Sequence, residues 1–193
     1  MPMTAKERWL AALRMEPVDR LPFWPKLDRA YPRAQVTPFC DMEIDAIHDW
    51  IGSDKHVGVG ACVREVRTKT SLEVTTHNGY RVEHFNTPSG SLERLNQFDV
   101  DSQSWHPVEF PVKRREDIAV MTEWLADCRV EVDGDRLATA QARVKEIGRG
   151  ASTRTSIGVS ALMDWVQHIA GIENAHLLLR DCPDDVEALF EAK

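Results

Sequence analysis

Eight polar side chains in this sequence could bind or act on a small molecule, because each lies shortly after an apolar run that is typical of a buried strand. Cationic side chains hold carboxylate or phosphate groups, carboxylates exchange protons, and a thiolate is a nucleophile. We treat the eight as candidates for substrate binding, and the sequence assigns no catalytic role to any of them. They are Lys26, Asp28, Arg29, Tyr31, Cys62, Glu65, Ser160 and Asp164.

Each candidate also has a plainer structural interpretation. The segment that ends at Tyr31 can be a solvated loop on which the tyrosine packs. Cys62 can be a small buried thiol and Glu65 an ordinary surface acid. Ser160 and Asp164 can satisfy free backbone N–H groups at the start of a helix. Both interpretations stay open.

The cysteines and histidines predict no metal site on this chain. The four cysteines are scattered without a CxxC pair, and no histidine lies at zinc-ligand spacing from any of them. We expect reduced thiols in a reducing compartment. His84 and His106 are interpreted as surface or packing residues.

The composition favours a soluble domain with a small-molecule substrate. The chain has 193 residues and a formal charge of −7, from 24 Lys and Arg against 31 Asp and Glu. An acidic, mixed surface disfavours nucleic acids and anionic membranes as partners. The N-terminus does not have the pattern of a secretion signal, and no run approaches the roughly 18 apolar residues of a membrane span. We predict a cytoplasmic location.

The first elements are predicted by local signals. Thr4 and Glu7 form the S/T-x-x-E pattern of a capping box, which predicts a helix over about 5–14. The apolar run Leu21–Trp24 between prolines predicts a first strand. Asp41 is expected to cap the next helix, which would end at Gly52.

Two later apolar runs predict buried parallel strands, and the segment between them predicts an insertion. The runs are His56–Val63 and Thr153–Val159, both rich in small or β-branched residues. Asn78 and Gly79 lie between alternating segments and favour a type I′ hairpin, so we expect an antiparallel β-meander over about 66–100.

Helical periodicity covers the rest of the chain. Stripes of apolar residues predict helices from Arg115 onward and before Gly148, and three more at about 161–170, 172–180 and 183–192. The order of elements indicates an α/β fold with insertions. Three core strands are fewer than the eight of a closed (β/α)8 barrel.

Four blocks of this sequence resemble the uroporphyrinogen decarboxylase (URO-D) superfamily in order. They are TAKERWLAALRMEPVDRLPFWP from Thr4, TPSGSLERL from Thr87, FPVKRREDI from Phe110, and GIENAHLLLRDCPDDVEALF from Gly171. The resemblance implies that residues 1–193 form the N-terminal half of a (β/α)8 TIM barrel with the meander inserted. Such a chain would lack the half that usually completes the active site.

Within this superfamily the chain looks most like the methyltransferase branch, which includes methyl-corrinoid:thiol methyltransferases. The resemblance implies transfer of a methyl group between a corrinoid and a small acceptor or donor. The alternative is the uroporphyrinogen decarboxylase of porphyrin and heme biosynthesis. That branch has an arginine where this chain has Leu27, a second where it has Tyr31, and a tyrosine that the stretch from Gly158 lacks. Arg29 or Arg33 could replace only the second arginine.

The resemblance also implies cofactors and partners outside this chain. The branch usually holds zinc on a His-x-Cys pair and a later cysteine in the missing half. The corrinoid would sit on a partner protein, because the chain has no D-x-H-x-x-G signature. A non-catalytic half-barrel that needs a second chain is the other alternative. Open sheet edges would then favour self-association or pairing with a C-terminal half.

Overall fold

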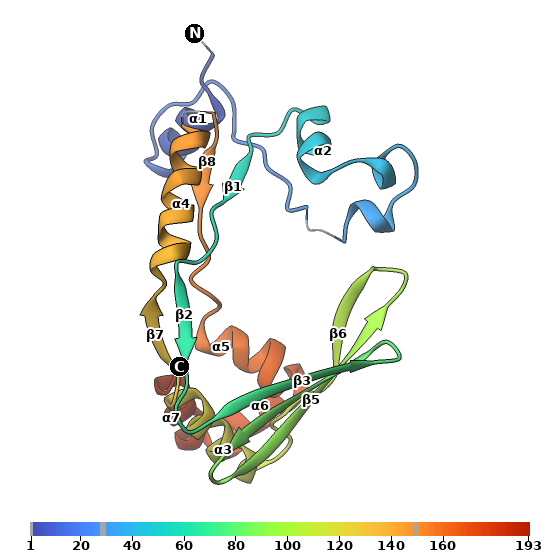
Figure 1. Ribbon diagram of the computed structural model, residues 1–193, viewed down its shortest axis with the longest axis vertical. Helices are drawn as coiled ribbons and strands as arrows, with labels where there is room; N and C mark the ends of the chain where they lie inside the picture. The colour runs from blue at the N-terminus through green and yellow to red at the C-terminus, as the bar shows by residue number, and fades with distance from the viewer. Residues whose placement is uncertain (1, 28–29, 149) are drawn as a thin grey trace. The chain divides into compact units, whose positions relative to one another are not determined.

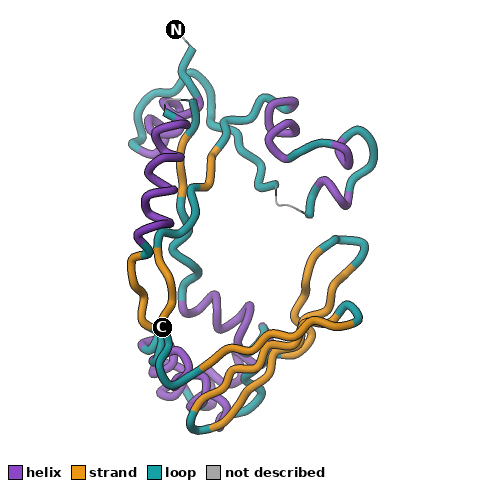
Figure 2. The backbone as a smooth tube through the Cα atoms, in the orientation of Figure 1, coloured by secondary structure: helices purple, strands orange, loops and turns teal. Residues whose placement is uncertain are grey.

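The computed structural model describes residues 2–27, 30–148 and 150–193, which form two compact units. The first unit comprises residues 1–63, 101–103 and 132–157, and the second comprises 64–100, 104–131 and 158–193. Figures 1 and 2 show the elements of each unit along the chain.

The first unit is mainly helical and begins with the predicted capping box. The Thr4 hydroxyl accepts a hydrogen bond from the Glu7 backbone N–H, and the Glu7 carboxylate accepts one from the Thr4 N–H, so this prediction is confirmed. The next helix begins after Glu43 rather than Asp41. The helices of this unit are α1 (Ala5–Leu13), η1 (Pro32–Ala34), η2 (Phe39–Asp41), α2 (Ile44–Trp50) and α4 (Gly134–Ile147).

The expected half-barrel is wrong. β1 (His56–Gly58) and β8 (Ser152–Arg154) do pair in parallel, but each has three residues and together they form a two-stranded sheet. The segment Leu21–Trp24, expected as a first strand, is irregular. With one short parallel pair among the described residues, the structure lacks the row of adjacent parallel strands that makes a barrel wall.

Glycines explain why the two apolar runs do not make long strands. Gly60 has a φ of +75° and Gly158 a φ of +88°, a backbone conformation that interrupts extended structure. Only the start of the run His56–Val63 therefore belongs to β1. Its last residue begins a different strand, β2 (Val63–Val66), which pairs with β7 (Arg129–Val132). Ile157 is 99% exposed rather than buried in a sheet.

The second unit is built on a four-stranded antiparallel sheet. Its strands are β3 (Ser71–His77), β4 (Tyr80–Thr87), β5 (Gly90–Asp99) and β6 (Ser104–Glu109), paired in chain order. The predicted hairpin at Asn78 and Gly79 is confirmed, since both residues have positive φ and His77 pairs with Tyr80. The mixed α/β fold thus rests mostly on antiparallel pairing.

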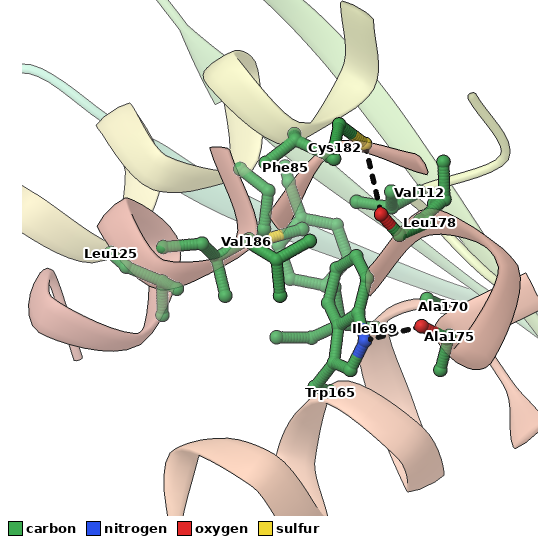
Figure 3. Close-up of a cluster of buried hydrophobic side chains, with 13 residues drawn as sticks. Phe85, Val112, Leu125, Trp165, Ile169, Ala170, Ala175, Leu178, Cys182 and Val186 are labelled. Carbon is green, nitrogen blue, oxygen red and sulfur yellow. Dashed lines mark hydrogen bonds between the residues drawn. The ribbon is translucent and has the colours of Figure 1, made fainter. Parts of the chain in front are cut away.

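Helices of the second unit pack on this sheet and on one another (Figure 1). Their shared core includes Phe85 from the sheet and Trp165, whose indole N–H donates to the Ala175 carbonyl at 3.2 Å (Figure 3). The Cys182 thiol donates to the Leu178 carbonyl at 3.1 Å. The elements are α3 (Arg115–Ala126), α5 (Ala161–Asp164), the π-helical turn η3 (Trp165–Ile169), α6 (Ile172–Asp181) and α7 (Pro183–Glu191).

Two of the blocks that carry the resemblance meet in this core. Gly171 precedes α6 with a φ of +78°, and a Cβ atom there would lie 2.7 Å from the Phe110 ring. Val112 donates its backbone N–H to Ile169 at 3.0 Å, and Asn174 donates its amide to the Val112 carbonyl at 3.0 Å. The block residues Phe110, Val112, Gly171 and Asn174 thus hold the framework of the second unit.

Candidate functional site

The first unit contains a cavity of about 930 Å³ that carries side chains of both charges. Carboxylates and guanidinium groups on one wall can bind a small polar molecule through charge-assisted hydrogen bonds. The lining residues are Pro32, Arg33, Cys40, Met42, Glu43, Ile44, Asp45, Gly58 and Arg154.

The two arginines reach this cavity from distant parts of the chain. Arg33 lies in η1, directly after the segment of candidate residues 26–31. Arg154 ends β8 and pairs with Gly58 of β1, and its guanidinium carbon lies 4.9 Å from the centre of the Trp24 ring. This stacking restrains Arg154 on an aromatic face.

A cluster of aromatic rings lies behind Arg154. Trp24 stacks on His48 with 6.1 Å between ring centres, and His56 meets the edges of both Trp24 and Trp9, the latter at 4.4 Å. Burial lowers the pKa of His48, and burial together with the nearby Arg154 lowers the pKa of His56. Both rings are therefore held in the neutral form at neutral pH.

The first unit should lose stability as the pH falls. Since the folded-state pKa values of His48 and His56 lie below the ordinary 6.5, the unfolded chain takes up protons first once the pH drops below that value. Stability that is present above pH 6.5 is thus lost toward pH 5. We expect a lower urea midpoint at pH 5.5 than at pH 8.

The measurement should follow the two units separately. Exchange of the Asp54 amide, which donates to Phe23 at 2.7 Å, reports on the first unit, and exchange of the Val112 amide reports on the second. Replacing His56 by glutamine should flatten the pH dependence seen at Asp54. An unchanged midpoint of the first unit across this range would contradict the prediction.

An ion-pair network around Asp54 holds the backbone at Phe23, which precedes the cavity-lining residues in the chain. Asp54 is 2% exposed and accepts hydrogen bonds from Arg8, from Arg20 at 2.9 Å and from the Phe23 backbone N–H at 2.9 Å. Arg8 also donates from Nε to Asp19 at 2.6 Å. The Arg8 guanidinium holds the pKa of Asp19 well below its usual range, so the pair is ionised at neutral pH.

The predicted candidates are divided between the units. In the first unit, Lys26 is exposed and Tyr31 is half-buried beside the cavity-lining Pro32. Asp28 and Arg29 lie outside the described residues. Cys62 is half-buried, and its carbonyl accepts from the Asp133 N–H at 2.9 Å.

The remaining candidates belong to the second unit. Glu65 is exposed on β2 and pairs with Arg67 at 3.3 Å. Ser160 caps α5 by accepting from the Met163 N–H at 3.3 Å, and the Asp164 N–H donates to the Ser160 carbonyl. The Asp164 carboxylate also lies 3.0 Å from Nδ1 of His168. Among the described candidates, Asp164 is the one that contacts an ionisable side chain on its own helical turn.

Sequence reasoning did not identify Arg154, the buried network or His168. The spacing of Asp164 and His168, four residues apart in a helical stretch, was a usable signal, because such pairs face each other. No comparable signal links Arg154 to Trp24, which lies 130 positions earlier.

Neither a metal centre nor a relative identifies the site. Among the residues that the structure describes, no three His, Cys, Asp or Glu side chains come together as ligands for a metal ion. In the same residues we find no helix with the length and apolar character needed to cross a membrane. No protein family model, curated protein or solved structure matches this chain.

Proposed function

We propose that this chain takes part in methyl transfer between a corrinoid on a partner protein and a small molecule that binds in the cavity of the first unit. The proposal joins the resemblance to the methyltransferase branch of the URO-D superfamily with one structural observation. That observation is the presence of Arg33 and Arg154 in the lining of a single cavity, next in the chain to the candidate Tyr31.

The arginines provide binding energy for an anionic group on the small molecule. A guanidinium offers a rigid fork of N–H donors that matches a carboxylate. The face of the Arg154 guanidinium stacks on Trp24, which leaves the N–H groups at its edge free to donate. Glu43 and Asp45 line the same cavity and balance this charge, so a substrate with a positive group as well is favoured.

The chain itself supplies binding and orientation in this reaction. A corrinoid on the partner would supply the methyl group, whose bond to the corrinoid would break with the electron pair left on the corrinoid. The thiol acceptor would form the carbon–sulfur bond and lose its proton to solvent. The described residues offer no ligand cluster for zinc, so no step is assigned to that metal on this chain.

The test is a comparison of two acceptors with methylcobalamin as the methyl source. We expect 3-mercaptopropionate to be methylated about 10-fold more efficiently than 2-mercaptoethanol, since one charge-assisted hydrogen bond at an exposed site is worth roughly 1.4 kcal/mol. Replacing Arg33 or Arg154 by methionine should abolish this preference. Arg14, the exposed C-cap residue that follows α1, provides the control variant R14M.

Two outcomes would contradict the proposal. Carbon dioxide release from uroporphyrinogen would favour the decarboxylase, despite Leu27 and the missing tyrosine. Absence of methyl transfer, together with concentration-dependent sedimentation, would favour a non-catalytic subunit that a second chain completes.

A further inference from the structure

The second unit contains a small cleft that the proposed function does not use. It has a volume of about 160 Å³ and lies between β3, β4, α3 and η3. Most of its wall is apolar, and two aromatic rings, Phe85 and Trp124, meet edge to face with 4.9 Å between centres. The lining residues are Leu72, Phe85, Arg94, Pro111, Met121, Trp124, Leu125, Asp164, His168 and Ile169.

His168 presents a hydrogen-bond acceptor to this cleft. Its Nδ1 lies 3.0 Å from the Asp164 carboxylate, which can only accept, so the proton of the neutral ring is on Nδ1. The lone pair on Nε2 is then available. Lys193 forms an ion pair with the other Asp164 oxygen, which helps to fix the orientation of the carboxylate. Asp164 directly precedes the π-helical turn η3 and His168 lies within it, and such local irregularities are frequent at functional sites.

Arg94 and Trp124 also line this cleft. Arg94 donates from Nε to Glu83 at 2.6 Å and from Nη1 to the His168 carbonyl at 3.4 Å, and a guanidinium has five N–H groups in all. The indole N–H of Trp124 is buried without a hydrogen-bond partner.

We propose that this cleft binds a compact aromatic alcohol, with the ring between the apolar walls and the hydroxyl on His168. An apolar cavity of about 150 Å³ holds one benzene molecule, so the volume admits a single six-membered ring. The hydroxyl donates to Nε2 of His168, and this is the one hydrogen bond assigned to the ligand. The site is in the second unit and does not depend on the methyl-transfer proposal.

The experiment measures binding of phenol and of toluene, which has the same ring without the hydroxyl. Titration of the full chain should shift the indole N–H resonance of Trp124, identified by its loss in Trp124→Phe. Phenol should bind about 5- to 10-fold more tightly than toluene, the factor for one net hydrogen bond. This comparison needs no variant of the site and is independent of any methyl-transfer activity.

Variants then assign the preference to His168. His168→Phe keeps a ring but removes the acceptor, so the two ligands should bind with equal affinity. His176→Phe alters an exposed histidine on α6 and should keep the preference. Leu72→Trp, at a half-exposed wall position, should weaken both ligands. Equal affinities in the unmodified chain, a preference that persists in His168→Phe, or an unshifted Trp124 resonance would each overturn the proposal.

Discussion

Replacing Asp54 by alanine is expected to unfold the first unit under conditions in which the second stays folded. The change leaves Arg8, which is 5% exposed, with Asp19 as its one carboxylate partner among the described residues, and it frees the Phe23 N–H. Breaking a buried ion pair by removing one partner costs about 3–5 kcal/mol. That is a large part of the roughly 5–15 kcal/mol that stabilises a whole domain.

The effect should appear as lost protection of first-unit amides in hydrogen exchange. The Ile47 N–H, which donates to Glu43 at 3.0 Å, provides a reporter away from the substituted residue. Glu16→Ala serves as the control, because Glu16 is an exposed acid in the same unit and its loss should change the unfolding free energy little. Normal protection of Ile47 in Asp54→Ala would show that the network contributes little to stability.

Replacing Trp165 by alanine should be the most damaging single change in the second unit. The side chain is fully buried at the centre of the core, and its removal leaves a cavity and takes away the indole donor to the Ala175 carbonyl (Figure 3). Large-to-small changes of aromatic core residues cost about 3–5 kcal/mol. We expect a matching fall in the free energy of urea unfolding, measured by far-ultraviolet circular dichroism.

Two further variants separate the causes of this loss. Trp165→Phe keeps one ring and loses the hydrogen bond to Ala175, so it should cost less than the alanine variant. Leu162→Ala changes a residue that is 51% exposed one turn earlier and should be nearly neutral. Equal costs for the alanine variants at 162 and 165 would refute the central position of Trp165 in this core.

These stability tests also bear on the two binding proposals. Asp54 holds the Phe23 backbone just before Trp24, on which Arg154 stacks, so the cavity of the first unit depends on this network. Trp165 follows Asp164 directly and begins η3, which also carries His168. Loss of either anchor should therefore weaken binding at its own unit's site.

The sequence by itself determined the features that depend on neighbouring residues. The capping box of Thr4 and Glu7 and the hairpin at Asn78 and Gly79 are both present, because a cap or a two-residue turn is decided within a few positions. The helices from Arg115 and before Gly148 also follow from their apolar periodicity.

Only the tertiary structure decided how the strands pair and which side chains meet. An apolar run such as His56–Val63 has no periodicity that sets its length, and the positive φ of Gly60 divides it between two sheets. That division is why the half-barrel expected from the resemblance was wrong. The contact of Arg154 with Trp24 and the burial of Asp54 between arginines depend on long-range packing, which no local pattern of residues encodes.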